Sequence, residues 1–157
     1  MADNSHTHSQ CGGKVFISIE RLVGKQHDFL QINILDMGEG IHTTLKKNKK
    51  YSELSDEKAL LMAFKSKVSS WGDEHNRGKG LTDILKIAFE CNSFFRVESN
   101  ELAFMFYCQD KRREVKKIDS STKTSGTRFS ITLIDNKFRD TKRSEVDQFI
   151  DEFLEQL

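Results

Sequence analysis

The chain has 157 residues, with 25 basic side chains against 24 acidic ones. This length suits one domain with a substantial core, and the near-neutral charge gives no support for nucleic acid or an acidic membrane surface as a partner. No apolar run approaches the roughly 18–20 residues that span a bilayer, and residues 1–10 lack the features of a secretory signal. Cys11, Cys91 and Cys108 form no paired pattern, so we expect a reduced, cytoplasmic setting.

Two strands are predicted first. Residues 14–22 alternate apolar and polar side chains, and residues 29–36 place Leu30, Ile32 and Ile34 on one face. A short polar turn separates the two segments, which favours an antiparallel pair.

The middle of the chain is predicted to be rich in helices. We expect residues 42–55 to form a mobile, lysine-rich loop with little core of its own, and residues 56–68 to form a helix. Residues 69–80 are polar and contain glycines, which indicates a second loop. Residues 81–91 carry apolar side chains at the i, i+3, i+4 spacing of a buried helical stripe.

More strands follow towards the carboxyl terminus. Residues 94–98 and 103–108 read as strands joined at Ser99 and Asn100, residues 111–125 as a long exposed loop, and residues 128–134 as a last strand. An amphipathic helix over residues 144–157 ends the chain. This order predicts an α+β fold, a two-layer α/β sandwich with a mixed, mostly antiparallel sheet and helices on one face.

Three short elements carry candidate chemistry. The first, from Asp36 to Ile41, reads D-M-G-E-G-I directly after a strand. A carboxylate at a strand end can accept a hydrogen bond from an adenine amine, and Gly38 and Gly40 let the backbone approach a flat ring. A plain turn of the same residues is the structural alternative.

The second element, Arg77-Gly-Lys-Gly-Leu81, precedes the strongest helix, where unpaired amides form an anion site. A structural turn is again the alternative. A Walker A loop is excluded because Asp73 stands where its first glycine is required. The dinucleotide fingerprint is excluded because Thr43 stands where its third glycine is required. The third element, from Ser125 to Phe129, opens the last strand with glycine and threonine.

In this order the three elements resemble the glycine boxes of the GHKL superfamily of ATP-binding domains, which includes histidine kinases, topoisomerases and chaperones. The segment from Ala2 to Ser9 (ADNSHTHS) is similar to that superfamily's asparagine box. The resemblance covers residues 1–134, with an ATP lid over about 42–76, and leaves residues 135–157 as a linker and terminal helix. It is closest in form to histidine-kinase-like or anti-sigma-factor-like domains and implies the Bergerat fold.

The resemblance implies ATP and Mg²⁺ as ligands. Asn4 would hold the Mg²⁺, Asp36 would bind the adenine amine with Thr127 beside it, and Gly78, Gly80 and Lys79 would meet the phosphates. The residues implied in cofactor binding are Asn4, Asp36, Gly38, Gly40, Ile41, Arg77, Gly78, Lys79, Gly80, Leu81 and Thr127.

The family's catalytic glutamate lies four residues before the asparagine, a position upstream of Met1, so the catalytic residue is unknown. We expect a protein partner or a further domain upstream of Met1. Three readings remain open: a nucleotide-binding domain with kinase or ATPase activity, a non-catalytic interaction module that uses the lid or the terminal helix, and a decayed fragment.

Overall fold

The computed structural model describes residues 15–25, 28–70, 79–91, 93–109, 112–120, 125–134 and 143–157. The elements of this part of the chain are, in order, β1 (Val15–Val23), β2 (Asp28–Asp36), α2 (Ile41–Lys46), the 3-10 helix η1 (Lys49–Tyr51), α3 (Asp56–Met62), α4 (Gly80–Glu90), β3 (Phe94–Ser99), β4 (Leu102–Gln109), β5 (Arg112–Ile118), β6 (Thr127–Ile134) and α5 (Arg143–Leu154).

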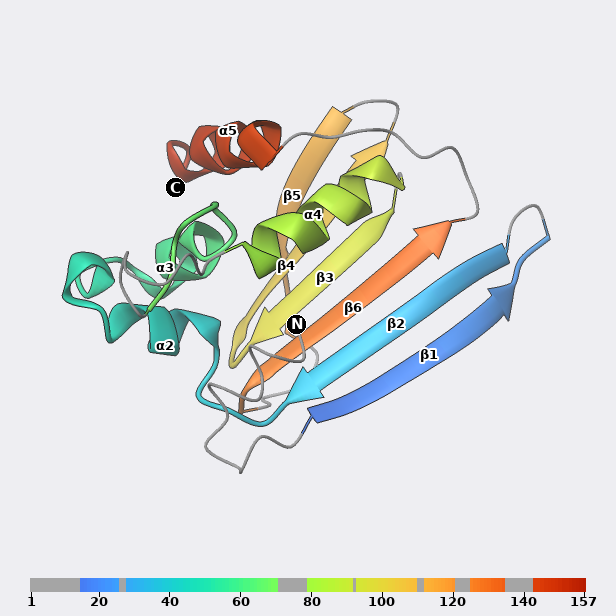
Figure 1. Ribbon diagram of the computed structural model, residues 1–157, viewed down its shortest axis with the longest axis horizontal. Coiled ribbons are helices and arrows are strands. Elements are labelled where there is room, and N and C mark those ends of the chain that lie inside the picture. Colours follow the sequence, from blue (N-terminus) through green and yellow to red (C-terminus); the bar gives the residue numbers. More distant parts are fainter. Residues whose placement is uncertain are drawn as a thin grey trace.

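The strands form one six-stranded sheet in the order β1-β2-β6-β3-β4-β5 (Figure 1). Every neighbouring pair is antiparallel, so the sheet is not mixed. The last strand, β6, lies between β2 and β3 and pairs with both. This insertion brings the third glycine element beside the first.

The helices cover one face of the sheet and one of its ends. α4 packs on β3, β4 and β6 and against α5, while α2 and α3 pack together beside the sheet (Figure 1). Phenylalanines dominate the core: the Phe64 ring lies 5.1 Å from Phe106, and the Phe95 ring stacks at 5.7 Å on Phe129, between centroids. The predicted α+β, two-layer architecture is confirmed.

The terminal helix α5 buries its apolar stripe within the chain. Val146 and Ile150 are fully buried, and α5 packs against α3 and α4. The aliphatic face predicted for this helix is therefore part of the core, and a partner that binds α5 must use its polar side.

The predicted loop over 111–125 is wrong, because most of its first half forms the edge strand β5. On its core-facing side only Val115 is apolar and buried. Arg113 lies over the Phe89 ring and pairs with Glu145, and Lys117 pairs with Glu57. The long stem of Arg113 takes the place of an aliphatic side chain.

The predicted mobile loop over 42–55 is also wrong. This segment holds α2 and η1, and His42, Leu45 and Tyr51 are buried in it. The helix expected over 56–68 ends at Met62, with Phe64 buried after it. No helix in the described residues is long and apolar enough to cross a membrane.

Candidate functional site

Three strand ends meet at one corner of the sheet. The register places Asp36, the last residue of β2, opposite Thr127, the first of β6, and places Thr127 opposite Ser99, the last of β3. All three residues are buried, although each is polar. Because alternate residues of a strand face the same side, these three lie on the face that carries Ile34, Phe129 and the helices.

The turn after β2 is closed by its own carboxylate. The amide of Gly38 donates to Oδ1 of Asp36 at 2.7 Å, and the hydroxyl of Ser125 donates to the carbonyl of Gly38 at 3.3 Å. Gly126 has φ +104°, and a Cβ on it would stand 2.1 Å from the Asp36 carbonyl oxygen. The first and third glycine elements therefore pack directly on each other, and alanine at position 126 would force them apart.

Asn100 joins the same two loops from the β3–β4 turn. Its Nδ2 donates to the carbonyl of Glu39 at 2.9 Å, and its Oδ1 accepts the amide of Gly126 at 3.0 Å. A Cβ on Gly40, which has φ +89°, would stand 2.7 Å from that Nδ2. Gly40 is thus required by contact with Asn100, independently of any ligand.

The start of α2 is fixed to the same corner through Ser99. Its Oγ accepts the amide of Ile41 at 2.8 Å and lies 3.1 Å from Nδ1 of His42. Burial lowers the pKa of His42; the Asp56 carboxylate partly opposes this shift, and Lys46 adds to it. Both side chains are buried, so the pair positions α2 and offers no exposed nucleophile.

The amino terminus of α4 lies at the same end of the sheet and on the same face. α4 leads into β3 through residues 91–93 and packs on β3, β4 and β6. Since β3 runs towards Ser99, the opposite end of α4 lies near the Ser99 end of the sheet (Figure 1). The topology therefore brings the first glycine element and Gly80, the described glycine of the second, to the same end of the sheet.

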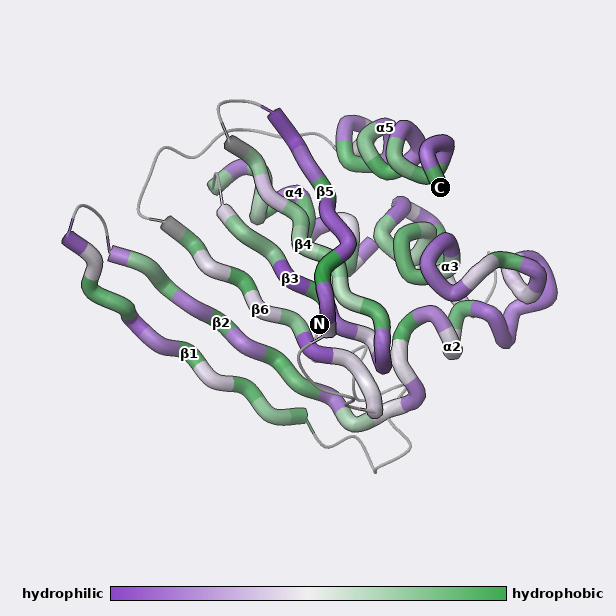
Figure 2. The backbone as a smooth tube through the Cα atoms, turned by 180° about the vertical axis from the view of Figure 1, so that it is seen from behind, coloured by the Kyte–Doolittle hydropathy of each residue, from purple (hydrophilic) through white to green (hydrophobic). Residues whose placement is uncertain are grey.

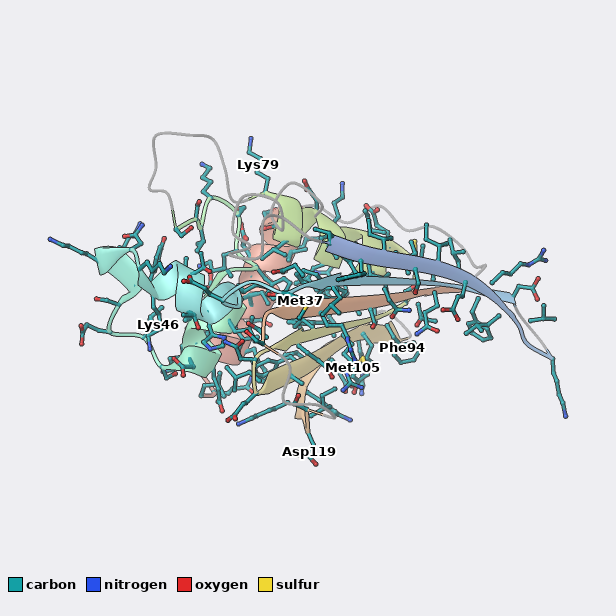
Figure 3. The ribbon with its side chains drawn as sticks, turned by 90° about the horizontal axis from the view of Figure 1, so that it is seen from below. Met37, Lys46, Lys79, Phe94, Met105 and Asp119 are labelled. Atoms are coloured by element: carbon teal, nitrogen blue, oxygen red, sulfur yellow. The ribbon has the colours of Figure 1, made fainter. Side chains whose placement is uncertain are left out.

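The residues of the second element have different surroundings. Gly80 is exposed, and a Cβ built on it meets no atom within 4 Å. Lys79 makes no side-chain cap, and its side chain extends away from the molecule on the α4 side (Figure 3). Leu81 is buried in the core, so only its backbone faces a ligand. Of Lys79, Gly80 and Leu81, Gly80 is the residue whose backbone a ligand can approach without meeting a side chain.

The remaining predicted residues, Asn4, Arg77 and Gly78, lie outside the described residues, and so does the part of the proposed lid over 71–76. Within the described ranges, no group of three histidine, cysteine, aspartate or glutamate side chains could hold a metal ion. The Mg²⁺ role implied for Asn4 stays a prediction.

Sequence reasoning missed the part that Ser99 and Asn100 play in this corner. The two were predicted only as a turn between strands. Asparagine at a turn tolerates a left-handed backbone, and Asn100 has φ 53°. That preference is visible in a sequence, whereas the contacts of the side chain with two loops far along the chain are not.

Comparison with known proteins adds no assignment: no protein-family model matches the chain, and no curated protein matches it.

Proposed function

We propose that this chain binds Mg·ATP, in the manner of a histidine-kinase-like domain of the GHKL superfamily. The observation that carries the proposal is the shared location of Asp36, Thr127 and the amino terminus of α4, on one face and at one end of the sheet. In the proposal the purine lies at the strand ends and the phosphates lie towards α4.

The base end uses Asp36 as an acceptor. An ionised carboxylate offers about four lone-pair sites, so the hydrogen bond from Gly38 is compatible with a second one from an adenine amine. The carboxylate is held by the turn that it closes, and its loop is packed against Gly126. A fixed acceptor of this kind loses little entropy when a base binds.

The phosphate end uses the first turn of α4. The first amides of a helix have no partner within it and point along the axis, where the helix dipole also favours an anion. The open space at Gly80 allows a phosphate to approach that backbone. Asp83 adds a negative charge in the same turn, which favours a phosphate that arrives with Mg²⁺ over a bare one.

Turnover of the bound ATP is a separate part of the proposal. Phosphoryl transfer depends mainly on positioning and on stabilisation of charge, so a kinase reaction with an acceptor supplied by a partner fits this mode of binding. ATP hydrolysis would need, in addition, a residue that orients the attacking water.

The second candidate is a non-catalytic interaction module, and one observation favours it. Residues 42–55, expected to be a mobile loop, hold α2 and η1, and α3 follows, with buried side chains in each of these helices. This segment therefore presents a formed surface to a partner. Lys46 and Lys47 on this surface are paired with Asp56 and Glu39, so a partner there would meet ion pairs.

Isothermal titration calorimetry with Mg·ATP tests the first proposal. We expect saturable binding by the unmodified chain. We expect Asp36→Asn to lose this binding, because it replaces one of the two acceptor oxygens of the carboxylate by a donor amide group. Asp119→Asn is the matched control, because Asp119 projects from the opposite side of the molecule to Lys79 (Figure 3). No binding by the unmodified chain, or equal binding by Asp36→Asn, would overturn the proposal.

Release or transfer of phosphate then separates the two candidates. Purified chain with radiolabelled ATP, alone and with a candidate acceptor protein, should release or transfer phosphate if the domain is catalytic. Saturable ATP binding without release or transfer supports the interaction module.

A further inference from the structure

The sheet has two edges, and they differ in character. The strand order puts β1 at one edge and β5 at the other. An edge strand presents unpaired backbone amides and carbonyls, and proteins usually protect such an edge with charged side chains. β5 is protected in this way, with Arg112, Arg113, Lys116 and Lys117 among its seven residues, and it is strongly hydrophilic in Figure 2.

β1 lacks such protection over most of its length. Ile17, Ile19 and Val23 are 54%, 64% and 82% exposed on the side that carries the helices elsewhere in the sheet. Phe16 and Leu22 are exposed on the opposite side. A nine-residue edge strand with apolar side chains on both sides is the type of edge at which another strand adds.

Among the described elements, α5 does not cover β1, because its apolar stripe is already buried against α3 and α4.

The sequence of β1 is complementary to itself when two copies run antiparallel. With Ile19 on a two-fold axis, Val15 stands opposite Val23 and Phe16 opposite Leu22, and the whole strand is paired. Directly opposite side chains of two antiparallel strands pack on each other, so these apolar pairs support the join. We propose that β1 is a homodimer interface, at which two copies join their sheets into one continuous sheet through antiparallel β1–β1 pairing.

The charges of β1 are compatible with this register. Glu20 stands opposite Ser18, and Arg21 stands opposite Ile17, so no two like charges are directly opposed. Arg21 already has a counter-ion, since its guanidinium pairs with Asp28 of the same chain. Its aliphatic stem remains able to cover the facing isoleucine.

The dimer is independent of the proposed nucleotide site. Asp36 pairs with Val15 at one end of β1, and in the proposed register Val15 stands opposite Val23 of the second copy. The two Asp36 residues therefore lie towards opposite ends of the joined sheet. Loss of the dimer and loss of ATP binding are distinguishable outcomes.

Sedimentation velocity of the full chain over a range of concentrations tests the interface. We expect a dimer that dissociates on dilution, and an Ile19→Lys variant that is monomeric at every concentration. Ile87→Lys is the matched control, because Ile87 is 45% exposed on α4, away from β1; this variant should remain dimeric. A monomeric unmodified chain, or a dimeric Ile19→Lys variant, would overturn the proposal.

Disulfide cross-linking tests the register itself. Directly opposite residues of antiparallel strands have Cα atoms about 4.5–5.5 Å apart, within the range that a disulfide spans. In a Cys11→Ser background, Ile19→Cys should therefore give an oxidised dimer, while Val23→Cys should not, because its two copies lie at opposite ends of the interface. The native Cys91 and Cys108 are buried. A dimeric sample that cross-links through position 23 and not through position 19 would contradict the register.

Discussion

Replacing Gly80 with alanine distinguishes a glycine that the fold needs from one that a phosphate needs. Gly80 is the first residue of α4, and a Cβ on it meets no atom within 4 Å. Its backbone is helical, so alanine can adopt it and leaves the unfolded chain with less freedom to lose. The free energy of unfolding should stay the same or rise by about 0.4–1 kcal/mol.

Nucleotide binding should respond in the opposite direction. The added methyl group stands where a phosphate would approach the first amides of α4, so we expect Mg·ATP affinity to fall at least about tenfold, a loss of about 1.4 kcal/mol. Adenosine, which lacks phosphates, should bind Gly80→Ala as well as it binds the unmodified chain. Asp36→Asn should weaken both ligands, because it acts on the base.

Calorimetry with the two ligands and urea denaturation of each variant provide the measurements. Unchanged Mg·ATP affinity in Gly80→Ala would refute a phosphate site at the amino terminus of α4. An equal loss of both ligands, together with a lower free energy of unfolding, would show instead that Gly80 has a structural role that its open surroundings do not reveal.

Three further predictions concern the frame around Asp36. Gly126→Ala should lower the free energy of unfolding by about 1–3 kcal/mol, because φ +104° is strained for alanine and the new Cβ meets the Asp36 carbonyl; an unchanged urea midpoint would contradict this. Asn100→Ala should cost about 1–3 kcal/mol through the lost bonds to Glu39 and Gly126, measured in the same way. The lowered pKa of buried His42 means that the unfolded chain binds its proton more readily. The free energy of unfolding should therefore fall as pH drops below about 6.5, and a His42→Gln variant, followed by urea denaturation at several pH values, should show a shallower fall.

The sequence was sufficient for elements whose apolar side chains follow a simple period. The alternation in β1 and β2 predicted two antiparallel strands, and the register confirms the pair from end to end. The stripe of α4 predicted a helix that the structure begins one residue earlier, at Gly80. In α4 the buried residues are mainly aliphatic or aromatic, so hydropathy marks the buried side. In β1 the alternation predicts the strand but not its burial, because most of its apolar side chains are exposed.

The sequence was insufficient where charged or isolated residues face the core. β5 has only one buried aliphatic residue, Val115. Its neighbour on the same side, Arg113, lies over the Phe89 ring and pairs with Glu145 of α5, although hydropathy counts arginine as an exposed residue. Residues 42–55 failed for a related reason: α2 and η1 are too short for a helical period, and their burial depends on contact with α3.

The candidate site shows the same limit more sharply. Gly40 and Gly126 both have positive φ, and each would collide with the chain itself if it carried a Cβ. The internal packing of the corner therefore accounts for two of the glycines that suggested a nucleotide site. The fold would require glycine at these two positions even if the protein bound no ligand.

Gly80 is informative because the fold explains it less completely: no described contact requires glycine at position 80. Asp36 is informative through its chemistry, because its carboxylate accepts the Gly38 amide in the turn that it closes. Asparagine can close the same kind of turn through its side-chain oxygen. Asp36→Asn should therefore keep the corner folded while it changes what the corner presents to a base, whereas Gly126→Ala should disturb both. If a nucleotide binds at this end of the sheet, Asp36→Asn should lower its affinity alone. Gly126→Ala should lower both the affinity and the free energy of unfolding.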